Sequence, residues 1–190
     1  KEALRLKPDY AEAHNNLGVE YGELGRDQEA IAEYKEALRL KPDLAEAHYG
    51  LGAAYGALGR HQEAIAEYRE ALRLKPGLVV AHNGLGLAYR ALGRHQEAIA
   101  EFKEALRLKP DYAEAHYGLG AAYGALGRYQ EAIAELKEAL RLKPDLAEAH
   151  CGLGLTYLTL GDRGAALEEH RILKDLDAER AAKLFQLLYP

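Results

Sequence analysis

Residues 45–78 read AEAHYGLGAAYGALGRHQEAIAEYREALRLKPGL, and the same order of small, aromatic and charged residues recurs along most of the 190-residue chain. The period is 34 residues, which separates each of the prolines Pro8, Pro42, Pro76, Pro110 and Pro144 from the next. The same step separates the histidines His14, His48, His82, His116 and His150. A fixed period of this length predicts an array of stacked structural repeats rather than one globular core.

Within each repeat, apolar residues recur at helical spacing in two segments, such as Leu17 to Leu24 and Ile31 to Leu38. We therefore expect two amphipathic helices in each repeat, A and B, and no strands. Gly25 and its equivalents lie where a left-handed residue can end helix A.

The loop after helix B contains Pro42 and Asp43, which we expect to break that helix. Asp43 and Glu46 have the spacing of a capping box, so we expect Asp43 to cap the next helix A. Gly18 and its equivalents lower helix propensity, and they indicate a close approach of helices A and B. Glu33 is expected on the solvated face of helix B.

Seven segments follow from the period. Residues 1–10 are the predicted end of helix B of a truncated upstream repeat, and residues 11–44, 45–78, 79–112 and 113–146 are four full repeats. Residues 147–176 form a diverged fifth repeat. Asp177 can cap a last amphipathic helix, so residues 177–190 are expected to form a C-terminal capping helix with no catalytic domain after it.

Eight positions of the first repeat carry a family resemblance: Leu17, Gly18, Tyr21, Gly25, Ala30, Tyr34, Ala37 and Pro42. Their order resembles the tetratricopeptide repeat (TPR), and the match covers residues 11 to about 176. Histidine replaces the family's tryptophan in every repeat, and His170 and Ala178 replace the aromatic residue and the proline of the fifth. The resemblance implies an all-α fold, a right-handed α-solenoid or superhelix of antiparallel helix pairs whose A helices line a concave groove.

The composition argues against several classes of partner. The formal net charge is −5 and the basic residues are interspersed with acidic ones, so we expect no nucleic-acid ligand. Charged residues interrupt every apolar run, so we expect no membrane insertion. Cys151 is the one cysteine, which excludes an internal disulfide and fits a reducing compartment, and we expect a cytoplasmic protein.

Catalysis is not expected, and neither is a metal, a cofactor or a small-molecule substrate. Side chains one repeat apart point in parallel, so the histidines do not converge on one ion, and we interpret them as partly buried packing residues. Cys151 takes a position that other repeats fill with asparagine or tyrosine, so we interpret it as a surface variant rather than a nucleophile.

The resemblance also implies a ligand-binding surface on the A helices. The candidate residues are Glu12, Asn15, Asn16, Val19, Glu46, Tyr49, Ala53, Asn83, Leu87, Arg90, Glu114, Tyr117, Ala121, Glu148, Cys151 and Leu155. Among them Tyr49, Tyr117, Leu87 and Leu155 are predicted apolar anchors, and the glutamates form a predicted acidic rim. The alternative for the small residues is that they only allow adjacent A helices to pack tightly.

We therefore predict a protein-interaction scaffold that binds a peptide or helix with apolar anchors and some positive charge. Two alternatives stay open at this point. The chain could assemble with neighbouring copies of itself, with the tail from Phe185 to Tyr189 entering a groove, or it could be the regulatory TPR arm of a larger, glycosyltransferase-like enzyme.

Overall fold

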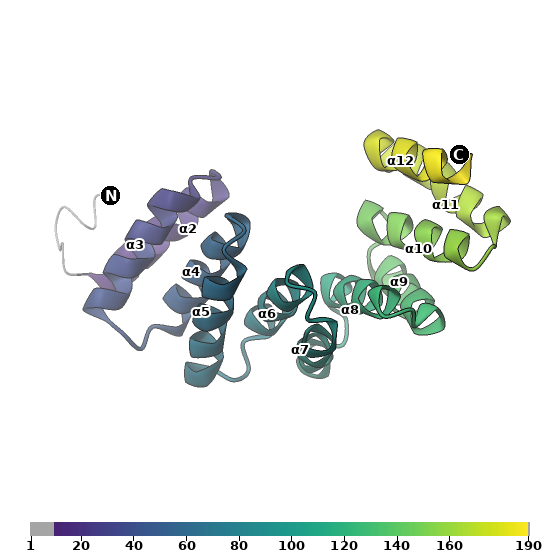
Figure 1. Ribbon diagram of the computed structural model, residues 1–190. Coiled ribbons are helices and arrows are strands. Elements are labelled where there is room, and N and C mark those ends of the chain that lie inside the picture. Colours follow the sequence, from purple (N-terminus) through teal and green to yellow (C-terminus); the bar gives the residue numbers. More distant parts are fainter. Residues whose placement is uncertain (1–9, 190) are drawn as a thin grey trace. The chain divides into compact units, whose positions relative to one another are not determined.

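The computed structural model describes residues 10–189, which form eleven helices and no strand (Figure 1). The helices are α2 (Ala11–Glu23), α3 (Asp27–Leu40), α4 (Ala45–Ala57), α5 (His61–Leu74), α6 (Val79–Ala91), α7 (His95–Leu108), α8 (Ala113–Ala125), α9 (Tyr129–Leu142), α10 (Ala147–Thr159), α11 (Arg163–Leu176) and α12 (Ala178–Leu188). The expected all-α solenoid of helix pairs is confirmed. The predicted end of an upstream helix B lies, except for Tyr10, outside the described residues.

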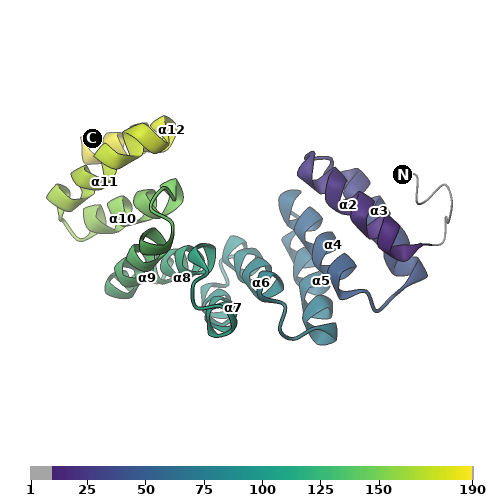
Figure 2. The same ribbon diagram turned by 180° about the vertical axis from the view of Figure 1, so that it is seen from behind.

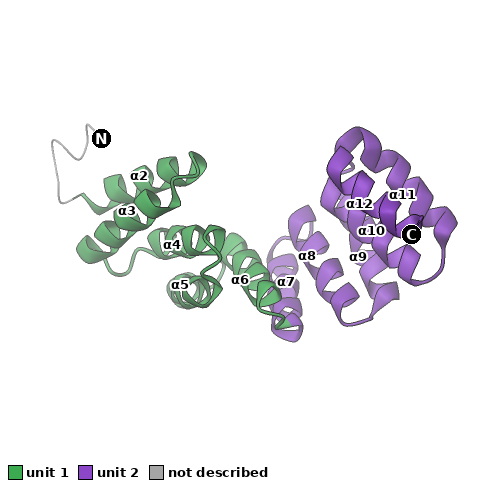
Figure 3. Cartoon of the chain, turned by 45° about the horizontal axis from the view of Figure 1, so that its top comes forward, with its two compact units in different colours: residues 1–94 green, residues 95–190 purple. Residues whose placement is uncertain are grey.

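The chain divides into two compact units (Figure 3). Unit 1 ends at Arg94, and unit 2 begins at His95. In unit 1 each helix from α2 to α5 packs against the next one, and the A helices α2, α4 and α6 also contact one another in order. In unit 2 the same holds from α7 to α12, and α12 packs on both α10 and α11. Figure 2 shows these helix pairs from behind. Each unit is thus a stack in which every helix covers its neighbours.

The turn between helices A and B follows the sequence prediction. Gly25 has a φ of 67°, and each of its four equivalents is also left-handed. The amide of Gly25 donates to the carbonyl of Gly22 at 3.0 Å, which satisfies part of the open end of α2. Glycine adopts this conformation without the steric penalty of a Cβ atom, so these positions end helix A.

The turn between helix B and the next helix A differs from the prediction. Leu44, not Asp43, is the N-cap of α4, and no side chain caps that helix. The turn is closed by the main chain, since the Leu44 amide donates to the Lys41 carbonyl at 3.3 Å. Glu46 is held by Lys75 at 3.0 Å. The predicted capping box is therefore wrong, because main-chain bonds close the turn and Glu46 pairs with Lys75.

The core of each stack is made mainly from leucine, alanine and aromatic side chains of both the A and the B helices. In unit 1, Leu51 of α4 is 2% exposed and Ala64 of α5 is fully buried. The ring of Tyr34 lies in a slot between two A helices. A methyl group placed on Gly18 of α2 would lie 2.7 Å from its Cε1 atom, and one on Gly50 of α4 would lie 2.5 Å from the same atom.

Helix α12, the predicted capping helix, packs on helices α10 and α11 of the fifth repeat. Asp177 Oδ1 accepts a hydrogen bond from the Arg180 amide at 2.9 Å, so the predicted N-cap is confirmed. Leu184 is fully buried, and a methyl group on Gly154 would lie 2.5 Å from its Cδ2 atom. Leu184 thus occupies the place beside the A-helix glycine that Tyr34 occupies in the first repeat.

Candidate functional site

Unit 1 has a pocket of about 250 Å³ on the surface of its A helices. We call it the Tyr68 pocket, and it is lined by Ala53, Gly56, Ala57, His61, Tyr68, Gly84, Leu87 and Ala88. The lining comes from α4 and α6, with His61 and Tyr68 added from α5. Two predicted ligand residues, Ala53 and Leu87, meet here. Leu87 is 38% exposed, so much of its side chain is open to a ligand.

Unit 2 has a pocket of about 340 Å³ between α8 and α10. We call it the Arg180 pocket, and it is lined by Tyr117, Gly120, Ala121, Gly124, Tyr129, Leu136, Glu148, Cys151, Gly152, Leu155, Thr156, Thr159 and Arg180. Five of these are predicted ligand residues: Tyr117, Ala121, Glu148, Cys151 and Leu155. Sequence reasoning missed Arg180, which the capping helix brings to the rim. The arginine precedes the apolar stripe of α12, and nothing in the repeat pattern indicates its position.

The other predicted ligand residues line neither pocket. They are Glu12, Asn15, Asn16, Val19, Glu46, Tyr49, Asn83, Arg90 and Glu114. Val19 is 43% exposed on α2, whereas Asn83 is almost fully buried in α6. The structure therefore gathers part of the predicted surface into two separate hollows.

The two predicted tyrosine anchors are half-buried and belong partly to the core. The Tyr49 ring lies 6.0 Å from the Tyr68 ring, measured between centroids, and burial raises the pKa of Tyr49. Tyr117 packs against the cluster that contains Leu136 and Leu153, and one side of it faces the Arg180 pocket. Each ring therefore supports its helix as well as offering contact area.

The glutamates of the predicted acidic rim are paired with cations. Lys41 binds Glu12 at 3.1 Å, Lys75 binds Glu46 at 3.0 Å, Lys143 lies 3.6 Å from Glu114, and Arg180 binds Glu148 at 2.9 Å. The hydrogen bond from Lys75 is the main reason that the pKa of Glu46 is lowered. These are exposed pairs, and such pairs contribute little to stability. Each rim glutamate has a cation beside it, so the rim has little net charge in the free protein.

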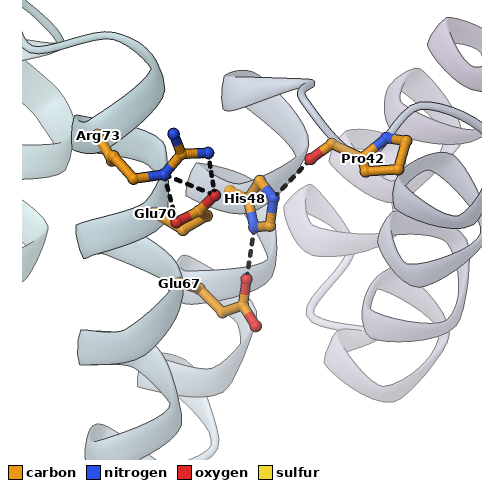
Figure 4. Close-up of polar contacts among 5 residues, drawn as sticks. All are labelled: Pro42, His48, Glu67, Glu70 and Arg73. Atoms are coloured by element: carbon orange, nitrogen blue, oxygen red, sulfur yellow. Dashed lines mark hydrogen bonds and ion pairs between the residues drawn. The ribbon is translucent and has the colours of Figure 1, made fainter.

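His48 joins three elements: helix α4, helix α5 and the loop that precedes α4 (Figure 4). Its Nδ1 atom lies 2.6 Å from Glu67 Oε2 on helix α5, and its Nε2 atom lies 3.0 Å from the Pro42 carbonyl oxygen. Both partners are acceptors, so the ring satisfies both only as an imidazolium that donates twice. The hydrogen bond to Glu67 is the main reason that the pKa of His48 is raised.

Other repeats have the same arrangement. His116 lies 2.6 Å from Glu135 and 3.0 Å from the Pro110 carbonyl, and His150 lies 2.6 Å from Glu169. In the first repeat, His14 lies 2.6 Å from Glu33, which is half-buried rather than on the solvated face predicted for it. The histidines are thus packing residues that also clamp helix A to helix B.

Residues 10–189 contain histidine, cysteine and acidic side chains, which are the common metal ligands and nucleophiles of proteins. No three histidine, cysteine or acidic side chains in that range are close enough to hold a metal ion. Burial raises the pKa of the Cys151 thiol, which keeps it protonated at neutral pH and unsuited to nucleophilic attack. No helix in the same range is long and apolar enough to cross a bilayer.

Glycine at the sixth residue of helix A has a packing role that sequence analysis missed. Each accommodates a bulky side chain from helix B of the preceding repeat: Gly50 takes Tyr34, Gly84 takes Tyr68, Gly118 takes Phe102 and Gly152 takes Leu136. The signal in the sequence is a bulky residue followed by glycine 16 positions later. Asn16, in the first repeat, is the one exception at this position.

Comparison with known families agrees with this geometry. The profile described as "TPR repeat" matches residues 18–59, 86–127 and 123–161, and the profile described as "Tetratricopeptide repeat" matches residues 45–78. Together they cover well over half of the chain. The chain belongs to the tetratricopeptide repeat family. The search of curated proteins found no significant match.

Solved structures share the TPR fold over almost the whole chain. TTC0263, a thermophilic TPR protein of Thermus thermophilus, is 28% identical, with a TM-score of 0.78 over 95% of this chain and 100% of its own. PilW, described as a type IV pilus biogenesis factor, is 25% identical, with a TM-score of 0.82 over 94% and 89%. YrrB, described as a TPR protein with an unusual peptide-binding site, is 24% identical, with a TM-score of 0.74 over 97% and 96%.

Proposed function

We propose that the chain is a non-catalytic scaffold whose A-helix surface binds a peptide or helix with apolar anchors and some positive charge. The TPR family and the similar structures support a protein-interaction role in general. The finer proposal is supported by one observation above all. The two described pockets are walled mainly by small and apolar A-helix residues, with Leu87 exposed in one and Leu155 exposed in the other.

Apolar contact is the main source of the proposed affinity. Leu87 is 38% exposed and Leu155 is 40% exposed, beside glycines and alanines that let a ligand approach closely. Covering such surface contributes about 25 cal/mol per Å². A hollow of 250 to 340 Å³ is at the small end for ligand pockets and fits one or two side chains of a ligand.

The positive charge of the ligand has a smaller proposed role. A basic side chain could reach Glu46 only by replacing Lys75, and Glu148 only by replacing Arg180. Such an exchange replaces one exposed ion pair with another, so its net contribution is small. We therefore assign affinity to the apolar anchors, and orientation and association rate to the charges.

The experiment uses a 12-residue peptide selected from a random display library on the wild-type protein. Leu87→Ala together with Leu155→Ala should weaken its binding about 5-fold or more, since the loss of about 1 kcal/mol of apolar contact in either pocket alone lowers the affinity about 5-fold. Leu167→Ala is the matched control, because Leu167 is 36% exposed on helix α11 and lines neither pocket. Equal loss in both proteins, or no loss in the double variant, would contradict the assignment.

Self-association is the second candidate, and the capping helix favours it. Phe185, Leu187 and Tyr189 are each about half exposed, and the Phe185 ring lies 4.8 Å from the Tyr189 ring between centroids. A hollow of about 470 Å³ borders Phe185 and His170. Sedimentation equilibrium at high concentration tests the idea: Phe185→Ala should shift any oligomer toward monomer, and a wild-type protein that stays monomeric excludes it.

A further inference from the structure

The hydroxyl groups of Tyr34 and Tyr68 lie at gaps in the A-helix surface of unit 1. The Tyr68 ring runs from α4 toward α6. A methyl group on Gly52 of α4 would lie 2.9 Å from its Cδ1 atom, whereas one on Gly84 of α6 would lie 2.8 Å from its hydroxyl oxygen. The base of the ring is therefore beside its own repeat, and its tip is beside the next one.

The tip of Tyr68 reaches the pocket. A methyl group on Gly56 would lie 3.9 Å from the Tyr68 hydroxyl oxygen, and Gly56, Gly84 and Tyr68 all line the Tyr68 pocket. Tyr34 repeats the arrangement one repeat earlier, since a methyl group on Gly50 would lie 2.8 Å from its hydroxyl oxygen. Gly50 holds in α4 the position that Gly84 holds in α6.

These hydroxyls have no hydrogen-bond partner among residues 10–189. Yet Tyr34 is 5% exposed and Tyr68 is 6% exposed, so each side chain has lost most of its contact with water. Burial raises the pKa of Tyr34 to about 12 and also raises that of Tyr68, so both phenols remain protonated donors. Neither hydroxyl oxygen is among the fully buried, unpartnered side-chain atoms of residues 10–189, so each donor is open to water or to a ligand acceptor.

Packing does not need the hydroxyls. Phe102 occupies the same repeat position in α7, and a methyl group on Gly118 would lie 2.5 Å from its Cζ atom. The ring without an oxygen therefore fits against the same glycine, and it is fully buried there. The two hydroxyls of unit 1 are thus additions to a core position that is filled equally well without them.

We propose that the hydroxyls of Tyr34 and Tyr68 donate hydrogen bonds to main-chain carbonyl oxygens of an extended peptide bound on the A-helix surface. The inference rests on the proposed function and makes it narrower. Glycine at positions 50 and 84 leaves no side chain between the phenol and a ligand backbone, so a carbonyl can approach to hydrogen-bond distance. A helical ligand has its carbonyls already bonded within the helix, so the ligand is an extended chain.

The experiment measures binding of the display-selected 12-residue peptide by fluorescence polarisation. Tyr34→Phe and Tyr68→Phe should each weaken binding roughly 2- to 12-fold, the range for one neutral hydrogen bond. Both variants should keep the helical content and melting temperature of the wild type, as Phe102 shows that phenylalanine fits. Tyr10→Phe is the control, because Tyr10 is 45% exposed and lines neither pocket.

A second series replaces single peptide amides with esters, whose carbonyl oxygens are weaker acceptors. An ester at a carbonyl that accepts from a phenol should weaken binding to the wild type but not to the Tyr34→Phe/Tyr68→Phe protein. If every ester weakened binding to the wild type and to the double variant by the same factor, the hydroxyls would contact ligand side chains rather than carbonyls. That result would overturn the inference. Unchanged affinity of the double variant also overturns it and leaves the proposed function standing, whereas failure of the wild type to select any peptide removes both.

Discussion

Substituting alanine for glycine should have opposite effects at two positions of one helix. In α8 a methyl group on Gly124 would find only Ala132 Cβ, at 3.9 Å, which is an ordinary contact. On Gly118 it would lie 2.5 Å from both Cε1 and Cζ of Phe102, a ring that is fully buried and cannot swing into solvent. Non-bonded carbon atoms prefer about 3.5 to 4.0 Å, so the ring must retreat by about 1 Å.

The magnitudes follow from two opposing effects. Alanine in place of glycine stabilises a helix interior by about 1 kcal/mol, and somewhat less in the last turn, where Gly124 lies. Overpacking a dense core costs about 1 to 3 kcal/mol. We therefore expect Gly124→Ala to stabilise the protein by about 0.5 kcal/mol. Gly118→Ala should destabilise it by about 0 to 2 kcal/mol after the helix gain is subtracted.

Urea unfolding followed by circular dichroism gives the midpoints. Gly152→Ala adds an intermediate case, because its methyl group would meet the flexible side chain of Leu136 at 3.2 Å rather than a rigid ring. The expected order of midpoints is Gly124→Ala, then Gly152→Ala, then Gly118→Ala. If Gly118→Ala proved as stabilising as Gly124→Ala, the ring would not lie against that glycine and the account of the slot would be wrong.

Three further outcomes follow from the polar contacts. Hydrogen bonds to glutamate raise the pKa values of His48 and His116. The stabilisation from these bonds is therefore complete below the unfolded pKa of about 6.5 and is lost as the pH rises through the folded pKa. The urea midpoint should fall from pH 6 to pH 9, and His48→Gln with His116→Gln should flatten this dependence of the midpoint on pH. Asp177→Ala should cost about 1 kcal/mol and lower hydrogen-exchange protection in α12 first, with Asp177→Asn largely retaining the cap; equal loss in both variants would show that the charge, not the cap, matters. Cys151 should react with a disulfide reagent at pH 7 more slowly than an unfolded-chain cysteine, and rapid labelling of the folded protein would contradict the protonated, half-buried thiol.

Local sequence signals predicted the elements that depend on nearby residues. The 34-residue step and the helical spacing located the A and B helices, and Gly25 marked a left-handed turn that the structure shows. Asp177 was predicted as an N-cap on the same local basis and is one. In each case the interacting groups lie within a few residues of one another, so their order along the chain carries the information.

Contacts between helices were predicted less well. Asp43 lost its capping role because main-chain bonds close the turn, and Glu33 was placed in solvent although His14, 19 residues earlier, binds it. The partner of Gly50 is Tyr34 in the preceding repeat, a relation that a comparison of equivalent positions does not reveal. Arg180 reaches the pocket only through the packing of α12 on α10. These features depend on which faces meet, and one sequence does not state that.

The bulky residue and the glycine that accommodates it belong to different repeats, and this sets a rule for joining them. A segment copied from residues 45–78 carries Gly50 for the ring before it and Tyr68 for the glycine after it, so such copies can be linked in any number. Residues 11–44 break the rule in their first helix. Asn16 stands there in place of the glycine and would collide with a tyrosine placed 16 positions before it, as Tyr34 is placed before Gly50. A copy of residues 45–78 therefore fits when it is inserted after residue 44. The same copy does not fit when it is inserted directly before residue 11.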